Sequence, residues 1–174
     1  MNGDRLAQKE IYRLYYKAMY ATSLRILNDQ AEAEDAMQES FLAAFLKLKT
    51  YRGEMNFGAW LKRIVINKSI DQLRTRKLRF EEFSDNTDIT EDVKNNDLFE
   101  PDESMLKVQK IKEAIKLLPE GFRVVLSLAL FEGYDHEEIA MILNISESTS
   151  RSQLTRAKRK LVEYLRNIKY ESFG

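Results

Sequence analysis

The chain has 174 residues, enough for one domain or two small ones, and its 28 basic residues are balanced by 28 acidic ones. It has no cysteine, which excludes a disulfide framework and thiol chemistry. No apolar run is long enough to cross a bilayer and the N-terminus lacks a signal-peptide core, so we expect a soluble cytoplasmic protein without direct membrane insertion.

The charge is unevenly distributed along the chain. Residues 1–80 carry 15 Lys and Arg against 9 Asp and Glu, a net of +6, and residues 105–174 carry 12 against 9, a net of +3. Between them, residues 81–104 carry one Lys against 10 acidic residues, a net of −9, and show no hydrophobic periodicity. We therefore predict two domains, 1–80 and 105–174, joined by an acidic linker at 81–104.

All the periodic segments have helical spacing, so the predicted fold class is all-α. In the first half we expect helices from about Asp4 to Leu27, where Asn28 and Asp29 break the pattern, from Ala31 to Leu48, and from Phe57 to Arg79. Helical spacing in the first of these is given by Leu14, Ala18, Ala21 and Leu24–Arg25, and its tyrosines (Tyr12, Tyr15, Tyr16, Tyr20) are expected in the core and at its rim. The predicted core faces of the other two consist of Met37, Phe41, Ala44 and Leu48, and of Leu61, Val65, Ile66, Ile70 and Leu73.

The second helix has an unusual outward face, on which leucines lie among polar residues: Asp35, Gln38, Glu39, Leu42 and Leu46. A face that only needed solvation would not carry two leucines. It indicates either a docking surface for a partner helix or a face covered by a second layer of the same domain.

The loop Thr50–Asn56 precedes a long basic helix with a second polar stripe, formed by Trp60, Arg63, Asn67, Asp71 and Arg74. An aromatic ring, an amide and guanidinium groups are what unstacked bases and phosphates require. Trp60 could instead be half-buried in the core, and Asp71 is expected to pair with Arg74 or Lys68. The helix ends in a cluster that we expect to face phosphates by its charge: Arg74, Arg76, Lys77 and Arg79.

The second half predicts helices at 106–118 and 121–132, with Ile111, Ile115 and Leu118 facing inward and Gly133 as a C-terminal cap. Residues 134–161 then read as two helices with a tight turn. Asp135 and Glu138 form a capping-box pattern, Asn144 suits a left-handed turn, and Ser146 suits the N-cap of the last helix.

That last helix has two different faces. One stripe is small or apolar and suits packing: Ser150, Leu154, Ala157, Leu161 and Leu165. The opposite face is hydroxylic and basic, with Arg151 and Lys160 on its flanks: Ser148, Ser152, Thr155, Arg156 and Arg159. Such a face suits the phosphates and base edges of a DNA major groove, although a solvated basic face on an ordinary helical hairpin is the alternative.

Four stretches in this order resemble the extracytoplasmic-function sigma factors, the smallest members of the sigma-70 family: Ala33–Phe45, Tyr51–Arg76, Leu118–Phe122 and Tyr134–Leu161. The resemblance implies a sigma-2-like helical bundle and a sigma-4-like helix-turn-helix domain. It further implies a transcription initiation factor that binds core RNA polymerase and directs it to promoter DNA, with no enzyme activity and no cofactor. Because no sensor domain follows the last helix, we expect control from outside, and the resemblance implies a cognate anti-sigma factor.

The resemblance also assigns roles by position. It gives polymerase docking to Asp35, Gln38, Glu39 and Leu42. It gives capture of a flipped minus-ten base to Tyr51, Arg52, Gly53 and Asn67. On their position in the predicted helix from Phe57 to Arg79 we add further residues as contacts to the minus-ten element: Trp60, Arg63, Arg74, Arg76 and Lys77. It gives reading of the minus-thirty-five element to Arg151, Ser152, Thr155 and Arg156, to which we add Ser148 and Arg159. The acidic linker is expected to thread through the polymerase cleft.

Some residues depart from the family pattern, so the promoter sequence cannot be transferred: the turn Asn144–Ile145–Ser146, Gln153 and Thr155. Other classes fit less well. A two-component regulator would share the C-terminal hairpin but not Trp60 and Asn67, and a helical adaptor would not need two basic faces. An enzyme is disfavoured because His136 is the single histidine and no glycine-rich phosphate loop or metal cluster is present in the sequence.

Overall fold

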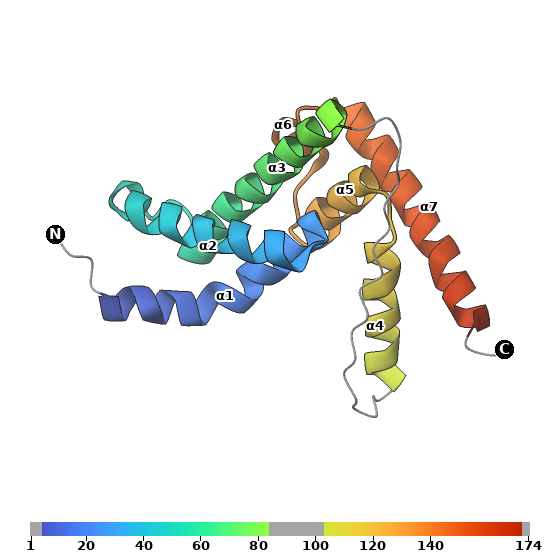
Figure 1. Ribbon diagram of the computed structural model, residues 1–174, viewed down its shortest axis with the longest axis horizontal. Helices are drawn as coiled ribbons and strands as arrows, with labels where there is room; N and C mark the ends of the chain where they lie inside the picture. Colours follow the sequence, from blue (N-terminus) through green and yellow to red (C-terminus); the bar gives the residue numbers. More distant parts are fainter. Residues whose placement is uncertain (1–4, 84–102, 172–174) are drawn as a thin grey trace. The chain divides into compact units, whose positions relative to one another are not determined.

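The computed structural model describes residues 5–83 and 103–171. These residues form seven α-helices and one 3₁₀ turn, and within them there is no strand, which confirms the all-α prediction (Figure 1). Most of the predicted linker, 81–104, lies outside the described residues, and helices extend into both of its ends. The chain divides into two compact units, and the first consists of the residues up to Lys77 together with Ile142–Asn144.

The first unit is a bundle in which α1 and α2 pack against each other. Its elements are α1 (Arg5–Leu27), α2 (Gln30–Lys47), η1 (Leu48–Thr50) and α3 (Phe57–Phe83). In the second unit, α4 and α5 pack against α7. Its elements are α4 (Glu103–Lys116), α5 (Glu120–Leu130), α6 (His136–Leu143) and α7 (Glu147–Glu171).

The break between α1 and α2 follows from two residues. Asn28 has a φ of 57°, in the left-handed region that ends the first helix. Asp29 is the N-cap of α2, since its Oδ1 accepts a hydrogen bond of 2.8 Å from the backbone N–H of Glu32. The predicted helix break at this pair is confirmed.

The core of the first unit is centred on six buried residues from three helices: Met19, Met37, Phe41, Ala44, Leu61 and Val65. All five core residues predicted for α3 are buried. In α2 the prediction for Leu48 is wrong, because the α-helix ends at Lys47 and Leu48 enters the 3₁₀ turn, where 38% of it is exposed. In α1 the face marked by Leu14 and Ala18 is exposed. Three of the four tyrosines lie at the core rim as predicted, whereas Tyr16 is exposed and the prediction for it is wrong.

The buried face of α1 contains hydroxyl groups as well as apolar side chains. Ser23 and Ser69, on α1 and α3, are both fully buried, and their Oγ atoms lie 2.9 Å apart in a hydrogen bond. Ser69 Oγ also lies 2.8 Å from the carbonyl oxygen of Val65. Ser69 can therefore donate its proton to this carbonyl oxygen while it accepts a hydrogen bond from Ser23. These bonds satisfy hydroxyl groups whose burial would otherwise be costly.

Gly58, in the first turn of α3, lies close to a tyrosine ring of α1. A Cβ atom at this position would be 2.9 Å from Cε1 of the Tyr15 ring, which itself packs against Phe57 at a centroid distance of 5.5 Å. We therefore expect Gly58→Ala to destabilise the first unit by about 1–3 kcal/mol through overpacking. Differential scanning calorimetry would record this as a lower transition temperature.

Gly121→Ala provides the matched control, because a Cβ at Gly121 would only meet Gln153 at 3.8 Å, an ordinary contact. This variant should leave thermal stability unchanged or raise it slightly, since alanine favours helix more than glycine does. Equal destabilisation by both variants would contradict the packing argument for Gly58.

A core cluster of the second unit is formed by Ile115, Leu118, Leu126 and Ala157. Two of the three inward residues predicted for the helix at 106–118, Ile115 and Leu118, are therefore correct, although Leu118 lies just after the end of α4. The third, Ile111, is wrong, because 41% of it is exposed. Among the α4 side chains that the structure describes, which begin at Leu106, the buried ones lie at the C-terminal end, where Ala114 is also buried. The spacing therefore identified the correct face but not how far along the helix the packing extends.

Among the described helices, none combines the length and the apolar character needed to cross a membrane.

Candidate functional site

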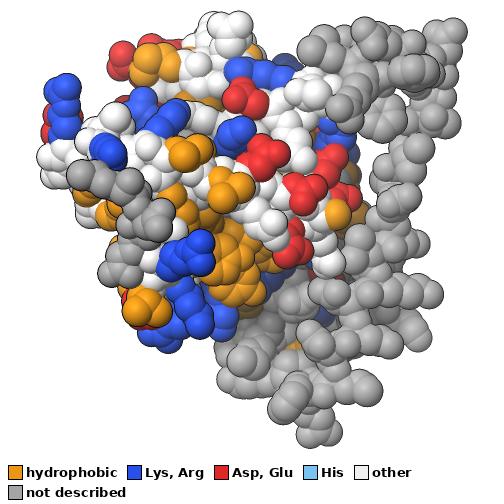
Figure 2. Space-filling model, turned by 60° about the vertical axis from the view of Figure 1, so that its left-hand side comes forward, with side chains coloured by type: hydrophobic (Ala, Val, Ile, Leu, Met, Phe, Trp, Pro, Cys, Tyr) orange, Lys and Arg blue, Asp and Glu red, His pale blue; other side chains and the backbone are white. Residues whose placement is uncertain are grey.

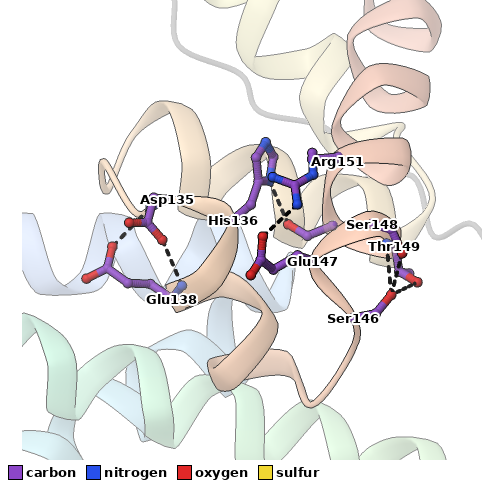
Figure 3. A network of polar contacts seen from close by, with 9 residues as sticks. Asp135, His136, Glu138, Ser146, Glu147, Ser148, Thr149 and Arg151 are labelled. Atoms are coloured by element: carbon purple, nitrogen blue, oxygen red, sulfur yellow. Dashed lines mark hydrogen bonds and ion pairs between the residues drawn. The ribbon is translucent and has the colours of Figure 1, made fainter.

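The helix-turn-helix motif has the local structure that its sequence predicts (Figure 3). Asp135 Oδ1 accepts a hydrogen bond from the backbone N–H of Glu138 at 2.8 Å, and Glu138 Oε2 accepts one from that of Asp135 at 3.0 Å, which confirms the capping box. Asn144 has a φ of 55°. Ser146 Oγ accepts a hydrogen bond from the backbone N–H of Thr149 at 3.1 Å and so caps α7.

The two predicted faces of α7 are separated in the structure. Ser150 and Ala157 on the inner face are fully buried. The six predicted outward residues are all exposed, and together they line one shallow, open surface: Ser148, Arg151, Ser152, Thr155, Arg156 and Arg159. Three hydroxyl groups and three guanidinium groups are thus interspersed along a single helix face.

Arg151 has a partner that the sequence reading missed. Its Nη2 lies 2.6 Å from Oε2 of Glu147, four residues earlier on the same helix. The i, i+4 spacing of a glutamate before an arginine was a signal that could have predicted this pair. The carboxylate orients the guanidinium, and it also adds negative charge next to the basic surface.

In the first unit, the loop between η1 and α3 forms a compact turn. Gly53 adopts a φ of +74°, a conformation that favours glycine. The Tyr51 hydroxyl donates to the carbonyl oxygen of Met55, and Asn56 caps α3 because its Oδ1 accepts a hydrogen bond of 2.8 Å from the backbone N–H of Ala59. The role of Asn56 as a cap was not predicted.

This loop and the first turn of α3 enclose a pocket of about 250 Å³, lined by Thr50, Tyr51, Arg52, Glu54, Met55 and Trp60. Its aromatic wall is a cluster in which the ring centroid of Tyr51 lies 5.1 Å from that of Trp60 and 5.8 Å from that of Phe57. Trp60 is half-buried in this cluster, which confirms the alternative that it packs against the core. Its side chain also lines the pocket.

The predicted stripe on α3 continues away from the pocket, with Arg63, Asn67, Asp71 and Arg74 all exposed. Asn67 does not line the pocket. It is seven residues beyond Trp60, a rise of about 10 Å along the helix. Within the described residues no hydrogen bond joins the Asn67 amide to the loop, which is held by its own contacts. Asp71 pairs with Arg74 at 3.5 Å, as predicted.

Two basic residues of α3 are engaged with α2. Arg76 Nη1 lies 3.0 Å from Oε2 of Glu32, and both side chains are partly buried, so Arg76 also holds the bundle together. Lys68 pairs with Glu39 at 3.0 Å and not with Asp71. Lys77 is exposed, and the side chain of Arg79 lies outside the described residues.

The outward face of α2 is open to solvent. Asp35, Gln38 and Glu39 are exposed, Leu42 is 64% exposed and Leu46 is 85% exposed. The idea of a second layer over these leucines is therefore wrong for the described part of the chain. The face drawn in Figure 2 has hydrophobic side chains next to Lys and Arg side chains.

Comparison with known proteins matches both parts of this chain. The family model for sigma-70 region 2 matches residues 11–79, and the model for sigma-70 region 4 matches residues 108–161. The RNA polymerase sigma-H factor of Pseudomonas aeruginosa is 30% identical over 98% of this chain and 92% of its own length. The ECF RNA polymerase sigma factor SigW of Bacillus subtilis is 28% identical over 95% and 92%.

Among solved structures, the sigma factor RpoE from Bartonella quintana, in complex with the anti-sigma factor NepR, superposes with a TM-score of 0.64 at 25% identity, covering 91% of this chain and 96% of that one. The chain therefore belongs to the sigma-70 family, whose members are transcription initiation factors that direct RNA polymerase to promoters. Within that family it is an extracytoplasmic-function sigma factor.

Proposed function

We propose that this sigma factor docks on core RNA polymerase through the outward face of α2, reads the minus-ten element through α3 and its preceding loop, and reads the minus-thirty-five element through α7. The observation that carries this proposal is the surface of six hydroxylic and basic residues on α7, opposite a stripe in which Ser150 and Ala157 are fully buried. Run-off transcription with purified core polymerase tests it: initiation at a defined start is expected, and no start-site selection would reject it.

The chemistry of α7 supports reading of duplex DNA. Arginines can donate two hydrogen bonds to the O6 and N7 atoms of guanine, and Ser and Thr hydroxyls can both donate to and accept from base edges. Residues 148–162 include no acidic side chain, so a helix lying in the major groove brings no like charge to the phosphates from this segment. The carboxylate of Glu147 is taken up by Arg151.

The loop pocket supports capture of an unstacked base. A base that leaves the duplex loses stacking and pairing at a cost of a few kcal/mol, which aromatic contacts and hydrogen bonds must offset. Tyr51 and Trp60 supply the aromatic wall, and Arg52 at the pocket supplies positive charge. Asn67, further along α3, contacts a neighbouring nucleotide of the same strand through an amide that both donates and accepts.

Asn67→Ala is expected to reduce discrimination at one minus-ten position while leaving melting of other promoter variants unchanged, because only one base edge loses its partner. Permanganate footprinting of open complexes on each single-base variant of the minus-ten element measures this directly. Equal loss on every variant would instead assign Asn67 a general structural role.

The remaining assignments follow from this function. The two units act as separate promoter-reading modules, with the predicted boundaries at residues 80 and 105. We assign the chain no catalytic activity and place it in the cytoplasm, where polymerase and promoter DNA are found. The likeness to a sigma factor solved with an anti-sigma factor supports control of this chain by such a partner.

A further inference from the structure

The single histidine of the chain joins the two helices of the helix-turn-helix motif. His136 is the first residue of α6, and its Nδ1 atom lies 2.9 Å from Oγ of Ser150 on α7. Ser150 is fully buried and His136 is partly buried. The imidazole and the hydroxyl therefore share a hydrogen bond that is largely shielded from water.

This hydrogen bond differs from the other side-chain contacts drawn in Figure 3. The pair Asp135–Glu138 remains within α6 and its cap, and the pair Glu147–Arg151 remains within α7. The hydrogen bonds of Ser146 also remain within the first turn of α7. In this network, only the hydrogen bond between His136 and Ser150 connects α6 to α7, the helix proposed to read DNA and called the recognition helix below.

The position of Ser150 on the helical wheel gives this contact its importance. With about 100° per residue, the six outward residues of α7 fall within an arc roughly 140° wide that is centred opposite Ser150. When the Ser150 side chain is fixed toward the core, the six residues on the opposite side of α7 are therefore fixed toward solvent. Ser150 is also too small to fix the rotation of the helix by apolar packing, and the next fully buried residue of α7 is Ala157, almost two turns later.

We propose that His136 is a positioning residue for the recognition helix, and that its hydrogen bond to Ser150 fixes the rotation of α7 about its own axis. A rotation of about 20° would displace an outward side chain, at a radius of 5–6 Å, by roughly 2 Å, more than a hydrogen bond to a base edge tolerates. This inference rests on the proposed reading of the minus-thirty-five element by α7.

Two substitutions of the same histidine separate the hydrogen bond from the ring itself. In His136→Asn, the amide places a polar atom near the position of Nδ1, so the bond to Ser150 can be kept. In His136→Gln, the amide end reaches the position of Nε2 instead, so the bond is lost. Ser150→Ala removes the other partner, and alanine is fully compatible with a helix.

The experiment uses the full chain with core polymerase on a promoter library in which both upstream elements are randomised and each promoter carries its own transcribed barcode. The barcodes of the run-off transcripts are sequenced to identify the promoters that were used. His136→Gln and Ser150→Ala should each lower the sequence preference in the minus-thirty-five element about fivefold, the value of one net hydrogen bond. His136→Asn should keep the preference, and the double variant His136→Gln with Ser150→Ala should be no worse than either single variant.

The minus-ten preference of the same transcripts serves as the internal control, since a positioning role in α7 leaves it unchanged. A parallel fall in both preferences would reveal a general folding defect and overturn the inference. So would full preference in His136→Gln, or a loss in His136→Asn equal to that in His136→Gln. A wild-type chain without any minus-thirty-five preference would overturn the proposed function of α7 as well.

Discussion

Replacing Leu42 by aspartate is expected to abolish assembly with core RNA polymerase at limiting protein concentration. Leu42 is 64% exposed on the outward face of α2, beside Gln38 and Glu39, and a docked partner would cover it. A carboxylate buried there without a partner costs about 2 kcal/mol or more, which corresponds to at least a thirtyfold loss of affinity. Competition for core polymerase, followed by fluorescence anisotropy, measures this loss.

Leu14→Asp is the matched control, because Leu14 is 63% exposed on α1, outside the proposed docking face. Both substitutions introduce the same charge at an exposed leucine, so neither should unfold the chain. Gln38→Ala should cause a smaller loss, since its amide already donates to Glu34 at 3.1 Å in the free chain. Equal loss in the Leu14 and Leu42 variants would show that the effect is not specific to α2.

A second large effect is expected for Arg156→Ala, on the outward surface of α7. If Arg156 contacts a guanine through two hydrogen bonds, its loss costs about 1–3 kcal/mol, concentrated at one base pair of the minus-thirty-five element. Run-off transcription on single-base variants of that element measures this loss. With Arg156→Ala, the unchanged promoter should be transcribed no better than the promoter variant in which the contacted base pair is replaced.

Arg166→Ala removes the same charge from the same helix, ten residues further along and outside the outward surface of α7. It should leave discrimination intact and change affinity weakly. A salt series separates the alternatives for Arg156, because a lost phosphate contact weakens all sequences alike and reduces the salt slope by about one. Uniform weakening would assign Arg156 to the backbone and remove it from base reading.

Most of the helical architecture could be predicted from local rules. The five core residues of α3 follow a regular helical spacing and are all buried. Capping residues were equally informative, since the side chains of Asp135 and Ser146 accept hydrogen bonds from backbone N–H groups within three residues of them in the chain. Such features depend only on neighbouring residues, which is why one sequence is sufficient to predict them.

Features that depend on contacts between distant segments were not predictable in the same way. The buried face of α1 includes Thr22 and Ser23, which read as polar until Ser69 on another helix is placed beside Ser23. Ile111 follows the correct spacing, but α4 is packed only near its C-terminus. For the candidate site, the sequence predicted the outward residues of α7, but not the contact between His136 and Ser150, fourteen residues apart.

The buried hydroxyl pair between α1 and α3 has a consequence for how this sequence can change during evolution. Loss of Ser69 alone removes the hydrogen-bond partner of the Ser23 hydroxyl inside the core, and loss of Ser23 alone leaves Ser69 with only its bond to the Val65 carbonyl. Replacing both serines by alanine is nearly neutral. Substitutions at these two positions are therefore accepted jointly more readily than singly. Across divergent relatives, the residues at positions 23 and 69 are expected to covary, although 46 positions separate them in the chain.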